Sequence, residues 1–183
     1  MTGTFRALVA AIIIPVVLIL DQWTKRIVLS VPELNGPGCL DRTQACGKIE
    51  VSSIFDISMV WNRGMSFGAF QSEGIMRWVL VAGTCAIALG FAIWLFRAST
   101  RLTTIALAFV VAGAIGNVVD RIRFGAVVDF LDFSGLWFPY VFNVADASVT
   151  VGAALLLGDQ FILSRKEANL AKAGGRVSEH PDS

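Results

Sequence analysis

The sequence predicts an all-α integral membrane protein with four transmembrane helices and a small extracytoplasmic β-sheet between the first two helices. The 183 residues are 55% hydrophobic and only 16% charged, whereas soluble domains carry about 25% charged residues. The mean hydropathy is +0.69. Four apolar stretches approach the roughly 20 residues that a membrane-spanning helix needs. Between the first two stretches, polar and apolar residues alternate, which is typical of a strand.

The four expected spans form one membrane domain over residues 1–165. The first is interpreted as a retained anchor, because no small-x-small cleavage site follows Leu20. The polar segment 166–183 is expected to be disordered. The predicted spans occupy residues 7–30, 75–96, 102–119 and 141–163.

An even number of spans places both termini on one side of the membrane. The lysines and arginines divide almost evenly between the two sides and do not decide the orientation. The compact Arg97–Arg101 turn and the basic flank after the fourth span favour cytoplasmic termini. The net charge of +1 gives no reason to expect nucleic acid as a partner.

The extracytoplasmic β-region is expected over about residues 48–72. Apolar and polar residues alternate from Ile49 to Trp61, which predicts one half-buried strand. A second strand is expected from Met65 to Gln71. Cys39 and Cys46 precede this region and are expected to form a small disulfide loop outside the cytoplasm, with free thiols as the alternative.

Asp129 and Asp146 lie near the ends of the third and fourth apolar segments. A charge at the bilayer centre costs roughly 2.5–3.5 kcal/mol, so acids in or beside membrane segments usually have a function. Aromatic residues crowd the linker 121–140, as they do at membrane–water interfaces, so both acids are expected at one interfacial level opposite the termini. Asn143 and Asp146 share a helix face, and the helix N-terminus favours the ionised form of Asp146.

A pair of converging aspartates can supply both a general base and a general acid. The one histidine, His180, lies in the polar tail, and the three cysteines have no metal-binding spacing. A histidine-based triad or a His-ligated zinc site is therefore excluded, and neither a metal nor an organic cofactor is expected. Because like charges at short distance do not coexist, one pKa of the pair should rise, but the sequence does not decide which.

The other polar residues of the membrane segments are interpreted as structural. Asp21 and Lys25, spaced i,i+4, predict a structural ion pair, and the cluster of Asn117, Asp120 and Arg121 also suits a structural role. A serine–lysine dyad is the catalytic rival, with Lys25 activating Ser66 or Ser148. No spacing favours that dyad, and Asp21 competes for the lysine.

Five motifs, in order along nearly the whole chain, resemble those of the lipoprotein signal peptidase (signal peptidase II) family. Each motif alone is weak, but all five in order on a four-span frame are specific. They are Asp21-Gln-Trp-Thr-Lys25; Asn62-Arg-Gly64-Met-Ser-Phe-Gly68; Gly113-Ala-Ile-Gly116-Asn117-Val-Val-Asp120-Arg121; Val127-Val-Asp129-Phe130; and Phe142-Asn143-Val-Ala145-Asp146.

The resemblance implies a membrane aspartyl endopeptidase of the bacterial inner membrane. Such enzymes remove signal peptides from prolipoproteins and cut before the cysteine that carries a diacylglyceryl group. Asp129 and Asp146 match the catalytic aspartates, and globomycin-like peptides are expected to inhibit. Membrane lipid is the other expected partner. The positions that match site-supporting or substrate-binding residues are Asp21, Lys25, Asn62, Gly64, Asn117, Asp120, Arg121, Asn143 and Ala145.

A non-enzymatic alternative has the same four spans with structural interfacial acids, in a proton-coupled carrier or an assembly factor. A carrier more often shows broken helices or internal repeats around a midplane site. The sequence contains no such repeat, and its acids gather at one level.

Overall fold

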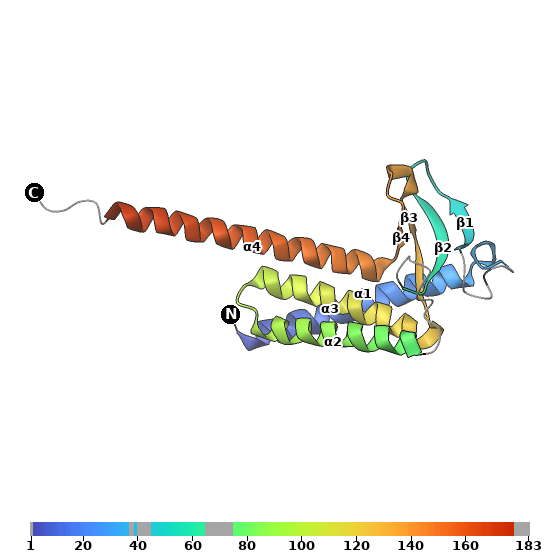
Figure 1. Cartoon of the computed structure of the whole chain (residues 1–183), viewed down its shortest axis with the longest axis horizontal. Helices are drawn as coiled ribbons and strands as arrows, with labels where there is room; N and C mark the ends of the chain where they lie inside the picture. The colour runs from blue at the N-terminus through green and yellow to red at the C-terminus, as the bar shows by residue number, and fades with distance from the viewer. Residues whose placement is uncertain (1, 37–38, 40–44, 65–74, 178–183) are drawn as a thin grey trace, which may run out of the picture.

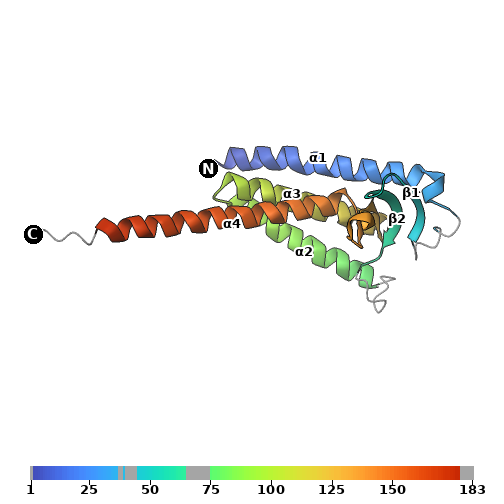
Figure 2. The same cartoon turned by 90° about the horizontal axis from the view of Figure 1, so that it is seen from above.

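The computed structural model describes residues 2–36, 39, 45–64 and 75–177, which form a bundle of four long helices with a sheet at one end (Figure 1). Both termini lie at the end of the bundle opposite the sheet, as Figures 1 and 2 agree. All four helices are long and apolar enough to cross a membrane, so the predicted fold class is confirmed. Their bounds are α1 Gly3–Ser30, α2 Ile75–Arg97, α3 Arg101–Phe124 and α4 Val144–Val177.

Helix α3 is the centre of the bundle. Most of its apolar stretch is buried, whereas only a small share of the apolar stretches of α1, α2 and α4 is buried. Large apolar side chains such as Ile19, Leu89 and Phe161 are more than half exposed. This pattern suits a protein whose outer helices face lipid, because lipid tails are as apolar as a protein core.

The described residues also form a four-stranded antiparallel sheet in the order β1-β2-β3-β4. The strands are β1 Ala45–Glu50, β2 Asp56–Asn62, β3 Val127–Asp132 and β4 Val141–Phe142. In the β2–β3 register, Asn62 lies opposite Val127 and Val60 lies opposite Asp129. Residues two apart on neighbouring strands share a face, so Asn62 and Asp129 are diagonal neighbours.

The single strand predicted from Ile49 to Trp61 is wrong, because a turn divides this segment into β1 and β2. Ser52 makes the turn: its backbone N–H donates to Phe55 O at 2.9 Å, and its Oγ accepts from Phe55 N at 3.1 Å. Serine in a turn of this kind satisfies the backbone locally. Ser53 and Ile54 break the polar–apolar alternation at the turn, but the alternation resumes in the same phase from Phe55, so the two strands were predicted as one. The second strand predicted from Met65 to Gln71 lies outside the described residues.

A small apolar core joins the end of α1 to the sheet. Val28, Leu34, Met59, Val128 and Phe130 are its buried members, together with Cys39. Cys39 is disulfide-bonded to Cys46, which confirms the predicted bridge. The core fixes β2 and β3 against α1, and these two strands carry Asn62 and Asp129.

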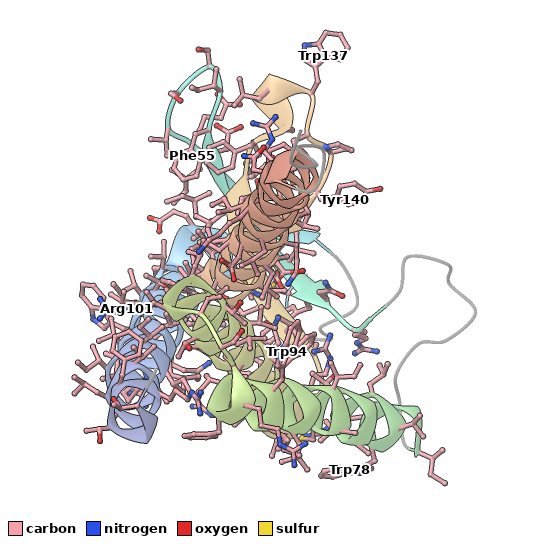
Figure 3. All side chains as sticks on the ribbon, turned by 90° about the vertical axis from the view of Figure 1, so that its left-hand side faces the viewer. Phe55, Trp78, Trp94, Arg101, Trp137 and Tyr140 are labelled. Carbon is pink, nitrogen blue, oxygen red and sulfur yellow. A yellow bond between two sulfur atoms is a disulfide. The ribbon has the colours of Figure 1, made fainter. Side chains whose placement is uncertain are left out.

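The connection between β3 and β4 carries exposed aromatic side chains. It includes the short helix η3 Ser134–Leu136, and Trp137 next to it is 96% exposed. Figure 3 shows Trp137 at the outer end of this connection, pointing away from the helices, and Tyr140 closer to α4. Amphipathic aromatic rings at this level suit a membrane–water interface.

Helix α4 is longer than the predicted span. It extends as a helix to Val177 and projects beyond the other helices (Figure 1), whereas disorder was predicted from residue 166. The segment Arg165–Lys172 is rich in Arg, Lys, Glu, Ala and Leu. These residues have high helix propensity, so polarity alone was a poor guide there. Residues 178–183 lie outside the described residues.

Glycines let α3 and α4 approach closely. A Cβ at Gly152 would lie 2.6 Å from both Ala106 O and Val110 Cγ2, and one at Gly113 would meet Ala145 O. Small residues at such crossings are the usual device for tight helix packing in membranes. This packing brings the start of α4 against α3.

Gly152→Ala should therefore destabilise the protein by about 1–3 kcal/mol, because the added methyl group would press against backbone of α3. The matched control is Gly158→Ala on the same helix, where a Cβ meets nothing within 4 Å. That change should leave stability unchanged or raise it by up to about 1 kcal/mol. Unfolding midpoints in detergent measure both, and equal midpoints would contradict the packing role of Gly152.

Candidate active site

Asp129 projects from β3 into the junction between the sheet and the helices. Its side chain is 1% exposed. Asn62 Nδ2 donates to Asp129 Oδ2 at 2.9 Å, and Asn143 Nδ2 donates to Asp129 Oδ1 at 2.6 Å. Each carboxyl oxygen therefore has an amide partner from a different element.

Gly64 orients the first of these amides. Its backbone N–H donates to Asn62 Oδ1 at 2.9 Å, with Gly64 at a φ of 95°. With Oδ1 occupied in this way, the NH₂ group of Asn62 faces Asp129. A positive φ favours glycine, so the turn needs this residue type.

Asp146 lies in the first turn of α4, where a reciprocal cap holds it. Asp146 N donates to Asn143 Oδ1 at 2.9 Å, and Asn143 N donates to Asp146 Oδ2 at 3.4 Å. This is the geometry of a capping box, with Asn143 as the N-cap residue and Asp146 three residues later. The local sequence thus fixes the carboxyl group at the helix start.

Asn143 connects the two aspartates. It caps α4 beside Asp146 with its Oδ1, and its Nδ2 donates to Asp129. Asn117 completes the arrangement: its Nδ2 donates to Asp146 Oδ1 at 2.8 Å, and its Oδ1 accepts from Asn143 Nδ2 at 3.2 Å. Asp129 and Asp146 are therefore parts of one hydrogen-bonded network.

The surroundings of Asp129 favour the protonated form of its carboxyl group. Burial, and after it the charge of Asp146, raise the pKa of Asp129 to about 7. The hydrogen bonds from Asn62 and Asn143 and the charge of Lys25 oppose this rise. Asp146 accepts two N–H donors at the start of α4. A pair of neighbouring carboxyl groups that holds one proton can act as general acid and general base.

Two grooves meet at Asp146. A groove of about 360 Å³ between α2, α3 and α4 is lined by Ile87, Phe91 and Ala114, with Asn117 and Arg121 beside Asp146. A second groove, of about 510 Å³, lies between α4 and the β3–β4 region. Its lining includes Asn62, Phe138, Tyr140, Phe142, Asp146 and Val151. Apolar surface is therefore available on two sides of the carboxyl pair.

The other predicted site residues form a second polar cluster beside the aspartates. Lys25 Nζ lies 2.8 Å from Asp21 Oδ2 and 2.8 Å from Asp120 Oδ2. Asp21 accepts a hydrogen bond from the backbone N–H of Ala145 at 3.0 Å. The structural ion pair predicted between Asp21 and Lys25 is present, and it also includes Asp120.

The serine–lysine alternative finds no geometric support. Ser148 Oγ donates to Phe109 O at 2.8 Å, while Lys25 pairs with two carboxylates. Ser66 lies outside the described residues.

Sequence reasoning missed Gln22, whose Nε2 donates to Asp120 Oδ1 at 2.9 Å and to Asp21 Oδ2 at 3.1 Å. It also missed the α2 side chains Ile87 and Phe91 in the first groove. Gln22 stands inside the first motif quoted above, but adjacent helical residues are not expected to share a face. The α2 residues gave no signal, because apolar side chains that line a groove look like any others in a membrane span.

A family model described as signal peptidase (SPase) II matches residues 13–162. The chain belongs to the signal peptidase II family. Among the lipoprotein signal peptidases it is similar to, that of Caulobacter vibrioides is 37% identical over 155 residues, covering 84% of this chain and 87% of the relative. That of Methylobacterium radiotolerans is 46% identical over 122 residues, covering 66% and 71%.

Solved structures agree with this membership. A bacterial membrane enzyme solved at 1.9 Å resolution aligns with a TM-score of 0.67 and 27% identity, covering 82% of this chain and 91% of that one. Another, solved at 2.3 Å resolution, has a TM-score of 0.65 at 23% identity and shares the fold.

The protein is thus a multi-pass membrane peptidase of the aspartic type, with a signal peptidase II function. Members of the signal peptidase II family act on prolipoproteins. The alternative of a carrier or non-enzymatic assembly factor is accordingly rejected.

The network predicts how substitutions move the titration of Asp129. Asp146→Asn should lower the pKa of Asp129, because it removes a neighbouring negative charge, and Asn143→Ala should raise it by removing a hydrogen bond to the ionised form. Infrared spectroscopy across pH measures the pKa through the carbonyl band of the protonated acid. Loss of this band in Asp129→Asn assigns it to Asp129. A midpoint that stays in place in both variants would show that the carboxyl groups are not coupled.

Proposed function

We propose that Asp129 and Asp146 are the catalytic pair of this peptidase and that it cuts prolipoproteins before the diacylglyceryl-modified cysteine. The observation that carries the assignment is the Asn143 side chain, which hydrogen-bonds to Asp129 while capping the helix turn that holds Asp146. Two aspartates in one buried network, one with its pKa raised to about 7, have the properties that acid–base hydrolysis requires.

The proposed reaction begins with Asp146 ionised and Asp129 protonated. Asp146 takes a proton from water as the water oxygen attacks the scissile carbonyl carbon, and Asp129 transfers its proton to the carbonyl oxygen. The product is a neutral tetrahedral gem-diol. Asp146 then gives its proton to the nitrogen while Asp129 takes a proton from a diol hydroxyl group. The C–N bond breaks, the amine and the carboxylic acid leave, and the pair again holds a single proton.

The remaining matched residues support this chemistry. Asn62, Asn143 and Gly64 orient Asp129, while Asn117 holds Asp146. Arg121 lines the groove beside Asp146, and its buried Nε has no hydrogen-bond partner among the described residues. A peptide oxygen of the substrate would satisfy this donor.

The two grooves suit a substrate with apolar groups on both sides of the scissile bond. The signal peptide supplies an apolar segment on one side, and the diacylglyceryl group supplies acyl chains on the other. Each CH₂ group kept from water contributes about 0.8 kcal/mol. The grooves meet at Asp146, so binding of an apolar group in each groove would hold the scissile bond at the two aspartates. Globomycin-like cyclic peptides would compete for the same surface.

Asp129→Asn and Asp146→Asn should each reduce cleavage of a diacylglyceryl-modified prolipoprotein by at least about 10²–10⁴-fold, because each removes a proton-transfer group. Asp132→Asn is the matched control: it lies on the same strand, on the opposite face, and bonds to Ser58 Oγ at 2.6 Å. That variant should cleave at a near-normal rate.

The same assay gives the pH dependence. Since Asp129 must carry a proton and its pKa is about 7, kcat/KM should fall as pH rises above 7. Folded variants of Asp129 or Asp146 that cleave like the wild type would end the assignment. A profile that stays flat above pH 7 would reject Asp129 as the protonated partner.

We further propose that the sheet faces the extracytoplasmic side of the bacterial inner membrane, with both termini in the cytoplasm. The Cys39–Cys46 disulfide lies at the sheet end, and disulfides persist in oxidising compartments. Arg6 lies near the start of α1, Arg97 ends α2 and Arg101 begins α3. These helix ends lie opposite the sheet (Figure 1), as the positive-inside rule requires for cytoplasmic termini.

A fluorescent protein fused to the C-terminus should therefore fluoresce, and alkaline phosphatase fused there should be inactive. The opposite pattern would place the termini outside. Expression of both fusions, measured by immunoblot, is the control.

A further inference from the structure

A compact polar cluster lies between α1 and α3, next to the aspartate pair. We call it the α1 clamp; it consists of Asp21, Gln22 and Lys25 of α1 and Asp120 of α3. Lys25 is 2% exposed and both carboxylates are fully buried. Lys25 Nζ lies 2.8 Å from an oxygen of each carboxylate.

Gln22 bridges the same two carboxylates in parallel with Lys25. Its Nε2 lies 3.1 Å from Asp21 Oδ2 and 2.9 Å from Asp120 Oδ1. Its Oε1 accepts from Arg123 Nη1 at 3.1 Å. Two donors on α1 therefore hold the separation between Asp21 and Asp120.

Each carboxylate of the clamp then holds a backbone amide next to a member of the pair. Asp21 Oδ1 accepts from Ala145 N at 3.0 Å, and Ala145 directly precedes Asp146. Asp120 Oδ2 accepts from Val128 N at 3.2 Å, and Val128 directly precedes Asp129. Hydrogen bonds to charged acceptors are shorter and stronger than those between neutral groups.

The clamp has little room to shift. A Cβ added at Gly116 would lie 2.8 Å from Asp21 Oδ2 and 3.1 Å from Ala145 Cβ. The Asp21 side chain is thus tightly packed between α3 and the start of α4. A buried ion pair is weak evidence for added stability, since desolvation offsets much of the attraction. Fixed geometry is the better explanation for this arrangement.

We propose that Gln22 and Lys25 are positioning residues that set the separation between the Asp129 and Asp146 carboxyl groups through the backbone at Val128 and Ala145. Helix α1 thereby acts on the reaction although it contributes neither aspartate. This inference rests on the proposed function, because it requires those two aspartates to be the catalytic pair.

The decisive variant is Gln22→Leu, which removes both donor contacts with little change in size. A displacement of about 1 Å in a catalytic group costs about 10²-fold in rate, so kcat should fall by about 10- to 100-fold. KM should stay the same, because no α1 residue is among those lining the two grooves at Asp146. Hydrogen exchange should quicken in peptides containing Val128 and Ala145.

Two controls separate positioning from general stability. Thr24→Val changes a polar side chain on the same turn that, within the described part of the chain, bonds only to α1 carbonyl oxygens at 2.8 and 3.0 Å. Asp159→Asn alters a buried carboxylate near the far end of the bundle, where it bonds Thr100 at 2.5 Å. Asp159→Asn should lower the unfolding midpoint, and both controls should keep the wild-type kcat per folded enzyme.

A second variant tests the same proposal if Gln22→Leu folds poorly. Arg123 is exposed, so Arg123→Ala should fold while loosening Gln22, and kcat should fall by a few-fold. Arg123→Lys should restore kcat, because it returns a donor. If folded Gln22→Leu keeps wild-type kcat, or loses kcat only as much as Asp159→Asn does, the positioning role is overturned.

The pair itself is checked in the same experiment. If the wild type cleaves and Asp129→Asn and Asp146→Asn do not, the pair holds, and any failure at Gln22 concerns the clamp alone. If Asp129→Asn or Asp146→Asn cleaves normally, the proposed function fails, and the clamp proposal is overturned with it.

Discussion

The hydrogen bond from Asn143 to Asp129 is the interaction on which the arrangement of this protein depends. Asn143 begins α4 and caps it beside Asp146, while Asp129 belongs to a strand of the sheet. The Asn143 side chain can make both contacts only if the start of α4 lies against β3 at Asp129. The close α3–α4 packing at Gly113 and Gly152 brings the helix there, and the apolar core at Val128 and Met59 brings the strand.

The membrane explains why so many polar groups are satisfied within the protein. An unpaired charge in an apolar medium costs several kcal/mol, so buried acids there need partners. Asp21 and Asp120 share Lys25, and Asp159 bonds to Thr100 and Thr103. Asp129 accepts hydrogen bonds from two amides, which lower its pKa. Burial, and after it the charge of Asp146, outweigh these hydrogen bonds and raise the pKa of Asp129 to about 7, which suits it to carrying a proton.

Much of the fold could be predicted from local pattern. Span number follows from the length of apolar stretches, and the disulfide from two cysteines in a loop outside the membrane. The capping box of Asn143 and Asp146 is an i,i+3 relation, which sequence reasoning placed on one face. Polar–apolar alternation gave the sheet its approximate place, but β1 and β2 were predicted as one strand because the alternation has the same phase on both sides of the turn at Ser52.

The sequence by itself determined the membrane class, the four spans and the family to which the motifs belong, because each rests on composition or on residues close in the chain. Only the tertiary structure decided which polar groups meet. Ala145 and Asp21 are 124 residues apart, and Gln22 and Asp120 are 98 apart. No periodicity encodes such contacts; they arise because helix packing and sheet register bring distant backbone amides and carboxylates together in a medium that offers them no water.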